Sequence, residues 1–202
     1  MSKSAKNNRL RIIGGNWRGR LLEVADVPGL RPSGDRSRET LFNWLQPWVP
    51  AADCADLFAG TGALGFEAAS RGAASVLMIE KHPQAQAVLR QSIEQLQAEQ
   101  VSLHAGGAMS KIEEMKPDSF DLVFVDPPFD SNLGGLVLER LARKECVRRG
   151  GFVYLESPLS LNPTPPEGWS VWRDQQMGEV RMQLFRRQLQ GDERNSVDDG
   201  SD

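Results

Sequence analysis

The residues with the clearest chemical potential are Asp126, Pro127, Pro128 and Phe129. They follow the apolar run 122–125, so we expect them to open a loop at the end of a buried strand. A carboxylate and a backbone carbonyl can each accept one N–H of an amino group, and consecutive prolines fix the direction of that carbonyl because φ is locked. The ring of Phe129 offers a flat face for a base, which contributes about 1–3 kcal/mol.

The chemistry that these four residues suit is methyl transfer to an amino nitrogen. An exocyclic amine on an aromatic base is a weak nucleophile, because its lone pair is delocalised into the ring. Holding both N–H groups favours a tetrahedral nitrogen whose lone pair faces an electrophilic methyl group, and most of this catalysis is positioning. The segment therefore predicts an amino nitrogen as the acceptor, and by itself it does not choose between guanine, adenine and glutamine.

A glycine-rich loop is the second feature with chemical consequences. Gly60, Gly62 and Gly65 satisfy G-x-G-x-x-G between a predicted strand and a predicted helix, and Glu80 ends the next predicted strand. Such glycines let the backbone approach a ligand closely, and the carboxylate can accept the hydroxyls of a ribose. NAD and S-adenosylmethionine both carry an adenosine ribose. Asp56 favours S-adenosylmethionine, since a carboxylate attracts its ammonium and sulfonium and repels a pyrophosphate.

Alternating strands and helices are expected to position these two loops. The apolar strands are predicted at residues 55–58, 75–80, 101–103, 121–125 and 151–156, and the helices at 63–71, 83–100 and 133–144. Strands that are apolar along their whole length, separated by helices, indicate a parallel sheet covered on both faces. Ligands of such sheets bind outside the carboxyl ends of the strands, so both loops should face one crevice.

Further elements are expected before and after this core. Two β-like runs, 169–173 and 180–186, are separated by a Gln-Gln-Met-Gly turn and fit an antiparallel addition at the sheet edge. Residues 10–22 are typical of a β-hairpin, and Asp35 is a candidate N-cap for a helix 36–48. The expected organisation is a disordered N-terminus (1–8), a basic hairpin and helix extension (9–50), a cofactor-binding domain (51–187) and an acidic disordered tail (188–202).

Charge is distributed unevenly along the chain. The net charge is −3, yet residues 1–40 carry nine basic and four acidic side chains, and residues 191–202 carry five acids and one arginine. A basic front end indicates contacts to phosphates, which supply affinity without sequence information. Trp17 either stacks on an unpaired base or packs the hairpin onto the domain, and Arg36 or Arg38 either contacts nucleic acid or reaches a cofactor carboxylate. The predicted nucleic-acid contacts are Arg9, Arg11, Trp17, Arg18, Arg20, Arg36 and Arg38.

Several classes of protein are disfavoured. Cys54 and Cys146 form no CxxC pair, and His82 and His104 do not stand at metal-ligand spacing, so we expect neither a disulfide framework nor a metal site. No apolar segment follows the basic N-terminus, and no run approaches the ~18 apolar residues of a membrane span. We expect a monomer in the reducing cytoplasm, with no membrane partner.

The stretches RIIGGNWRGR, RPSGDRSRETLFNWL, DLFAGTGALGFEA and DPPF together resemble the bacterial 16S ribosomal RNA guanine-N2 methyltransferase family, over about residues 9–187. The two N-terminal stretches are specific, whereas the glycine loop and DPPF are shared with adenine-N6 and glutamine-N5 enzymes. The resemblance implies a Rossmann-like class I methyltransferase: a doubly wound, mostly parallel seven-stranded sheet whose last strand is antiparallel, plus an N-terminal hairpin and helix. It also implies S-adenosylmethionine as donor and a guanine of 16S ribosomal RNA, free or in the small subunit, as acceptor.

The resemblance also implies roles for the cofactor-binding residues. By position, Asp56, Phe58, Gly60 and Gly62 line the methionine and ribose side of the cofactor, and Glu80 holds the ribose hydroxyls. Asp126 to Phe129 hold the target amine.

One position departs from the pattern of such enzymes. They often carry Asp or Asn where this chain has Gly107, so recognition of the adenine ring is expected to use backbone groups near Ala108.

Three alternatives stay open. The first is methylation of adenine N6 in nucleic acid or of a protein glutamine, although DNA adenine enzymes usually carry a target-recognition domain for which this chain has no room. The second is an NAD-dependent oxidoreductase, which leaves DPPF unexplained. The third is a non-catalytic RNA-binding module, against which the intact Asp126 argues.

Overall fold

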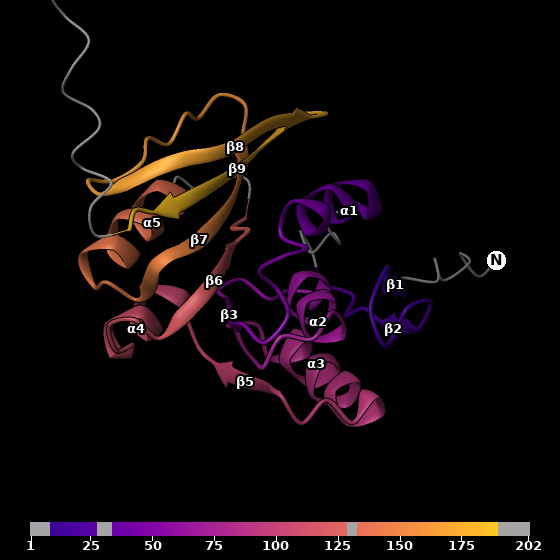
Figure 1. The fold of residues 1–202 in the computed structure, drawn as a ribbon. Helices are drawn as coiled ribbons and strands as arrows, with labels where there is room; N and C mark the ends of the chain where they lie inside the picture. The colour runs from indigo at the N-terminus through magenta and orange to yellow at the C-terminus, as the bar shows by residue number, and fades with distance from the viewer. Residues whose placement is uncertain (1–8, 28–33, 129–132, 190–202) are drawn as a thin grey trace, which may run out of the picture.

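The computed structural model describes residues 9–27, 34–128 and 133–189. It contains a seven-stranded sheet and a separate two-stranded hairpin (Figure 1). The hairpin pairs β1 (Arg9–Arg11) with β2 (Leu21–Glu23). The strands of the large sheet are β3 (Asp53–Asp56), β4 (Ser75–Glu80), β5 (Val101–Ala105), β6 (Phe120–Val125), β7 (Val147–Pro158), β8 (Trp169–Met177) and β9 (Val180–Arg187). The helices are α1 (Asp35–Trp44), α2 (Ala63–Ser70), α3 (Pro83–Leu96), α4 (Ala108–Glu114) and α5 (Leu133–Arg143).

The strand order in the large sheet is β5-β4-β3-β6-β7-β9-β8. The first five of these strands are mutually parallel, and β9 runs antiparallel to both β7 and β8. The predicted doubly wound sheet with an antiparallel last strand is therefore confirmed. The strand order reverses between β3 and β6, which puts the loops after these two strands at the switch point where such sheets bind ligands.

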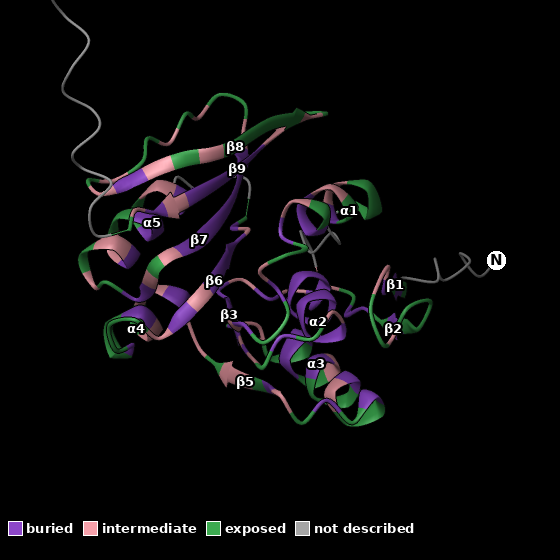
Figure 2. Ribbon diagram, viewed as in Figure 1, coloured by how far each residue is buried: buried purple, intermediate pink, exposed green. Residues whose placement is uncertain are grey.

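Helices cover both faces of the sheet (Figure 1). Side chains of α1, α2 and α3 pack with one set of strand residues, and side chains of α4 and α5 pack with the other set. Successive residues of a strand point to opposite faces, so Phe124 contributes to the first cluster and Val123 and Val125 to the second. The central strands are buried along most of their length (Figure 2), which explains their continuous apolar sequences.

The predicted helix boundaries need three corrections. Asp35 is the first residue of α1 rather than its N-cap; the N-cap is Gly34, and α1 ends at Trp44, ahead of Pro47. Helix α3 ends at Leu96 instead of residue 100, because the next residue adopts a left-handed conformation. Helix α4 was not predicted, since its seven residues are too few to show a helical period.

The strands need corrections at their ends. Strand β3 covers residues 53–56 rather than 55–58, and β5 continues two residues past the predicted 103. Strand β7 begins four residues before the predicted 151. Strand β8 includes the Gln-Gln-Met of the predicted turn, and the chain reverses at Gly178, which has a φ of +63°. Most of the missed residues at strand ends are polar, whereas the apolar Leu57 and Phe58 lie just outside β3.

The N-terminal hairpin is docked on α2. The backbone N–H groups of Ile13 and Gly14 donate to the buried carboxylate of Glu67, at 2.9 and 2.7 Å. Gly15 has a φ of +74°, and a Cβ there would lie 1.9 Å from the carbonyl oxygen of Ser70. The hairpin is thus attached to the helix that follows the glycine loop. Within the described ranges, no helix is long and apolar enough to cross a membrane.

Candidate active site

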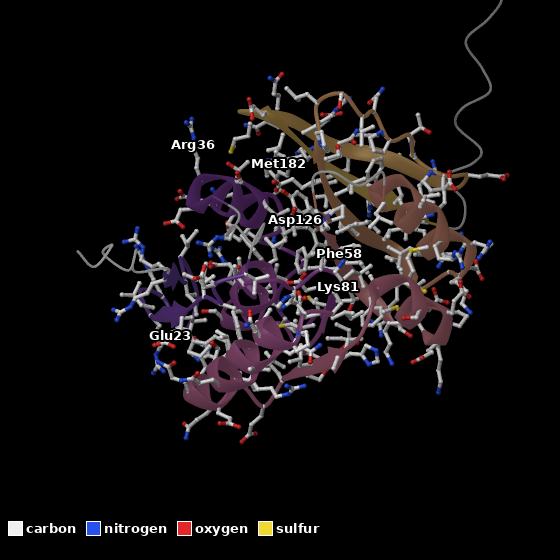
Figure 3. All side chains as sticks on the ribbon, turned by 180° about the vertical axis from the view of Figure 1, so that it is seen from behind. Glu23, Arg36, Phe58, Lys81, Asp126 and Met182 are labelled. Atoms are coloured by element: carbon white, nitrogen blue, oxygen red, sulfur yellow. The ribbon has the colours of Figure 1, made fainter. Side chains whose placement is uncertain are left out.

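The predicted crevice lies at the carboxyl ends of the central strands. Asp56 ends β3, Glu80 ends β4 and Asp126 follows β6 directly. Pairing of β3 with β6 places Asp56 opposite Phe124. Asp126 comes two residues after Phe124, and because alternate residues of a strand point to the same face, it lies on the same face as Asp56. Figure 3 labels Asp126 together with Phe58, which follows β3 at this edge. The structure therefore brings the two chemically interesting loops together.

The glycine loop and Glu80 form one hydrogen-bonded unit. The N–H of Gly60 donates to one carboxylate oxygen of Glu80 at 2.8 Å, and the N–H of His82 donates to the other at 2.7 Å. Gly62 has a φ of +79°, and a Cβ there would lie 2.5 Å from the ring of Phe66. A side chain at Gly62 would therefore both strain the turn and displace the helix behind it. The loop and the acid are held rigid, as a ribose site requires.

Asp56 is a buried carboxylate with incomplete pairing. Its side chain is 1% exposed, and Oδ2 accepts the N–H of Gly65 at 3.0 Å. Oδ1 is buried without a hydrogen-bond partner in the described structure. Burial raises the pKa of Asp56 to about 7, and the charges of Asp126 and Glu80 also raise this pKa. A cationic group beside Asp56 would relieve both the burial cost and the repulsion.

The segment after β6 begins with a partly exposed Asp126, a buried Pro127 and an exposed Pro128. Phe129 lies outside the described residues. The charge of Asp126 raises the pKa of Asp56 and of Glu156, so this carboxylate acts electrostatically on both neighbouring strands.

Glu156 is a further buried acid near this edge that was not among the predicted site residues. It stands near the end of β7, is 7% exposed, and accepts the O–H of the buried Tyr154 at 2.8 Å. Burial and, second, the charge of Asp126 raise the pKa of Glu156 to about 7. A usable signal was present: Glu156 ends an apolar run, as Glu80 and Asp126 do, on the strand next to that of Asp126.

The charge balance of the crevice is acidic. Among the described residues, no lysine or arginine forms an ion pair with Asp56, Glu80 or Glu156. Uncompensated carboxylates in a partly desolvated site attract cations and repel phosphates. The arrangement suits a ligand that carries an ammonium and a sulfonium better than one that carries a pyrophosphate.

Two further predicted cofactor contacts lie at this edge of the sheet. Phe58 is half-buried and packs against the second core cluster. Ala108 is buried and is the first residue of α4, directly after Gly107. Gly107 has a φ of −87°, and a Cβ there would meet only Ser110 Oγ, at 3.6 Å. Backbone strain therefore does not explain why glycine replaces an acid or amide at position 107.

Most of the predicted nucleic-acid contacts are accessible. Trp17 is half-buried and packs against the first core cluster, which supports its packing role over free stacking. The exposed arginines of the hairpin and of the start of α1 are Arg9, Arg11, Arg18, Arg20 and Arg36.

The prediction that Arg38 contacts nucleic acid is wrong. Its side chain is 1% exposed, and Nη2 donates to Asp35 at 2.6 Å and to the carbonyl oxygen of Arg11 at 3.0 Å. Nη1 lies 3.6 Å from the buried carboxylate of Glu67. Arg38 therefore joins α1, α2 and the hairpin from inside, and it has no surface to offer a phosphate. Its helical position on the apolar side of α1, near Leu41 and Phe42, could have indicated burial.

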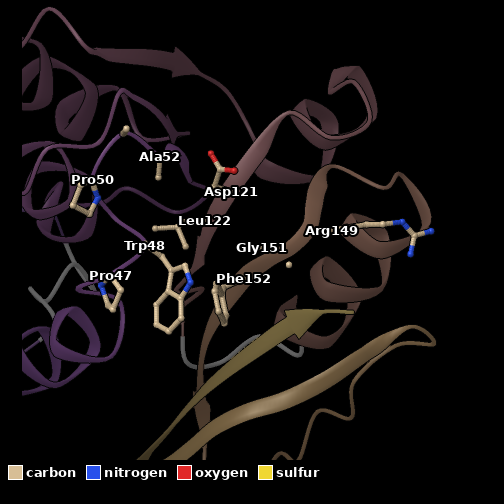
Figure 4. Close-up of a pocket in the computed structure, with 11 residues that line it drawn as sticks. Pro47, Trp48, Pro50, Ala52, Asp121, Leu122, Arg149, Gly151 and Phe152 are labelled. Carbon is tan, nitrogen blue, oxygen red and sulfur yellow. The ribbon is translucent and has the colours of Figure 1, made fainter. Parts of the chain in front are cut away.

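A cavity of about 350 Å³ lies at the opposite, amino-terminal edge of the sheet (Figure 4). It is lined in part by Trp48, Asp121 and Phe152. Asp121 and Asp126 stand at the two ends of β6, so this cavity is separate from the crevice that contains Asp126.

Comparisons with known proteins agree with this geometry. A family model described as conserved hypothetical protein 95 matches residues 10–186. The chain is 41% identical over 187 residues to the ribosomal RNA small subunit methyltransferase D of Escherichia coli strain K12, covering 92% of this chain and 94% of that relative. It is 36% identical to the Haemophilus influenzae protein of the same name, covering 88% and 93%. The solved structure of the Escherichia coli protein yhhF is 39% identical, with a TM-score of 0.83 over 90% of this chain and 99% of that one.

Proposed function

Because the chain belongs to the family described as conserved hypothetical protein 95, together with the ribosomal RNA small subunit methyltransferases D, we propose that it methylates 16S ribosomal RNA. The methyl donor is S-adenosylmethionine, and the acceptor is the exocyclic N2 of a specific guanine. The observation that carries the chemistry is the position of Asp126 and Pro127, at the end of β6 beside an uncompensated acidic crevice.

The residues of the crevice fit S-adenosylmethionine. The unpartnered Oδ1 of Asp56 and the acidic surroundings favour a cationic ligand. A side chain at Gly62 would collide with Phe66, and Gly60 has a φ of +53°. Glu80 retains lone pairs for ribose hydroxyls beyond the two N–H groups it accepts. Phe58 and Ala108 complete the proposed contacts to the cofactor. When bound, S-adenosylmethionine supplies an electrophilic methyl group on a sulfonium.

Asp126 and Pro127 are proposed to bind and orient the acceptor amine. The carboxylate accepts one N–H of the target amine, and the carbonyl of Pro127 accepts the other, which directs the nitrogen lone pair at the methyl carbon. With the cofactor bound, transfer of its methyl group to the nitrogen would leave one surplus proton on the amine. Asp126 is the nearest proposed acceptor for that proton. Pro128 holds the segment in its direction, and Phe129 is proposed to stack on the base.

The substrate RNA is proposed to bind across the basic hairpin. The exposed arginines there are Arg9, Arg11, Arg18 and Arg20, and Arg36 adds one at the start of α1. Glu67 and Ser70 attach the hairpin to α2, so the surface has a fixed position relative to the glycine loop. We place the enzyme in the cytoplasm, as a monomer, where it meets 16S ribosomal RNA free or in the small subunit.

The proposed reaction is tested by mapping methylated nucleosides. Ribosomal RNA from cells with and without the gene is digested and compared by mass spectrometry, and the purified protein is given radiolabelled S-adenosylmethionine and the unmethylated RNA. We expect one N2-methylguanosine of 16S ribosomal RNA to disappear in the deletion and to be restored in vitro. Loss of N6-methyladenosine would support the adenine alternative instead, and no lost nucleoside together with a lost methylglutamine in a peptide digest of the same cells would support the glutamine alternative.

The RNA surface is tested by reversing charge at Arg18 and Arg20. We expect the double Glu variant to bind RNA at least ~10-fold more weakly and to show a shallower dependence on salt, because each lost phosphate contact removes counterion release. The matched control is Arg143→Glu on α5, whose side chain is 65% exposed. Equal losses in both variants would show that the hairpin has no special part in binding.

A further inference from the structure

Glu156 lies beside Asp126 at the substrate end of the sheet. Strands β6 and β7 pair in parallel up to Val125 and Leu155, and Asp126 and Glu156 are the next residue of each strand. Neighbouring strands are about 4.8 Å apart, and residues in register point to the same face. The charge of Asp126 acts on Glu156, which agrees with this placement.

Glu156 does not have the environment of a structural acid. The buried Glu67 accepts two backbone N–H groups and the guanidinium of Arg71, at 2.7 to 2.9 Å. By contrast, the hydrogen bond described for Glu156 comes from the neutral O–H of Tyr154. A carboxylate has about four acceptor positions, so Glu156 keeps acceptor capacity next to the place where the target amine binds.

The Watson–Crick edge of guanine presents two neighbouring donors, the N2 amino group and N1–H. Adenine presents its N6 amino group beside N1, which is an acceptor. We propose that Glu156 accepts the N1–H of the target guanine while Asp126 holds N2, so that Glu156 selects guanine over bases with an unprotonated N1. This inference rests on the proposed function and deepens it.

The discrimination follows from unpaired acceptors. A base with a lone pair at N1 would place that lone pair against the carboxylate of Glu156, and two acceptors would face each other without a proton. A site that forms a hydrogen bond to its substrate strongly rejects analogues that cannot form this bond, because the polar group of the site is then buried and unpaired. We expect kcat/KM for guanine to exceed that for such a base by about 10- to 100-fold.

The test uses 2-aminopurine, which keeps the N2 amino group and has an acceptor at N1. After the target guanine is mapped, a synthetic segment with either base at that position is ligated into 16S ribosomal RNA. Methyl transfer is measured at pH 8.5, above the pKa of about 7 for Glu156, so that the carboxylate is ionised. We expect the wild-type kcat/KM to favour guanine at least ~10-fold, and methylation of both bases at equal rates would overturn the inference without any variant.

The variant Glu156→Gln tests the role of Glu156 more directly than the wild type alone. Its amide N–H can donate to N1 of 2-aminopurine, so the preference for guanine should fall at least ~10-fold, and transfer to 2-aminopurine should rise in absolute terms. Glu156→Asp retains a carboxylate and should keep the preference at a lower rate. A variant that only disturbed the fold would slow both substrates equally, and that unchanged ratio would refute the role of Glu156.

The failure of this inference is distinguishable from the failure of the proposed function. If the wild type methylates guanine N2 but its preference does not depend on Glu156, only the role of Glu156 is lost. If the wild type modifies no guanine in 16S ribosomal RNA, the proposed function is lost, and the inference is lost with it.

Discussion

The two edges of the central sheet treat their acidic residues in opposite ways. At the amino edge, Arg148 donates to Asp121 at 2.6 Å and to Asp53 at 2.9 Å. At the carboxyl edge of the same two strands, Asp56 and Asp126 lie among further carboxylates. Strands β3 and β6 each have an acid at or next to both ends, so the difference lies in the partners and not in the strands.

The pKa directions express this difference. A hydrogen bond from Ser75, followed by Arg148, lowers the pKa of Asp53. Burial raises the pKa of Asp56 to about 7, and neighbouring acids add to the shift. An acid with a lowered pKa is stabilised by the folded protein, whereas an acid with a raised pKa is destabilised in its charged form. Among the described residues, the acids of the amino edge thus share a cationic partner, Arg148, whereas Asp56 and Glu156 at the carboxyl edge form no ion pair.

The cavity does not coincide with the candidate active site. The cavity of about 350 Å³ lies at the amino edge, where Trp48 packs against Phe152 with ring centroids 4.9 Å apart. Its acid, Asp121, is already paired with Arg148. Charged groups without a partner therefore indicate the position of the candidate active site better than cavity volume does.

The largest expected difference between the two edges concerns the acids at the two ends of β6. We expect Asp126→Ala to lower kcat for methyl transfer by about 10²- to 10⁴-fold, because the target amine loses the acceptor that positions it. The dissociation constant for S-adenosylmethionine should change by no more than about threefold. Single-turnover transfer and calorimetric binding measure the two quantities.

Asp121→Ala is the matched control for that change. It removes an acid from the same strand at the other edge, so it should lower stability and leave kcat within about twofold. Loss of S-adenosylmethionine binding in Asp126→Ala would mean that Asp126 belongs to the cofactor site and not to the acceptor site.

Much of this arrangement was predictable from the sequence. The strands that end at or next to Glu80 and Asp126 contain long apolar runs, so the placement of these two acids at the carboxyl edge was predicted. Asp56 was placed inside a predicted strand 55–58, whereas it ends β3. The antiparallel last strand came from the family resemblance and is confirmed.

The remaining features depend on which residues meet in space. The burial of Arg38 could not be read from charge, since its partners Asp35 and Glu67 are separated by 32 positions along the chain but meet between α1, α2 and the hairpin. The role of Arg148 is similar, because it joins acids from two other strands. Glu156 ends an apolar run as Glu80 does, but its position beside Asp126 depends on the pairing of β6 with β7.

A smaller effect is expected on the pH dependence of S-adenosylmethionine binding. Asp56 must be ionised to attract a cation, and its pKa of about 7 means that the ionised fraction rises as pH rises through 7. Affinity should therefore increase about 3- to 10-fold between pH 6 and 8.5, with a proton released on binding. Calorimetry in buffers of different ionisation enthalpy measures both quantities. Asp56→Asn should remove most of the pH dependence, and a pH dependence that survives in this variant would assign it to Glu156.

The smallest expected effect concerns the amino edge. Arg148→Gln removes the charge that pairs Asp53 with Asp121, but the side chain of Arg148 is 38% exposed, so water screens much of the loss. We expect the free energy of unfolding to fall by about 1 kcal/mol at pH 7, with Tm lower by about 2–4 °C. Because the pKa of Asp53 is lowered below its ordinary value of 3.8, its stabilising contribution is fully present above that value and shrinks as pH falls through the lowered pKa. The two proteins should therefore differ less in stability at pH 3 than at pH 7. Urea unfolding at both pH values measures this, with the exposed neighbour Arg149→Gln as control. An unchanged kcat would complete the contrast between the edges, whereas a large loss of kcat would show that the amino edge takes part in the chemistry.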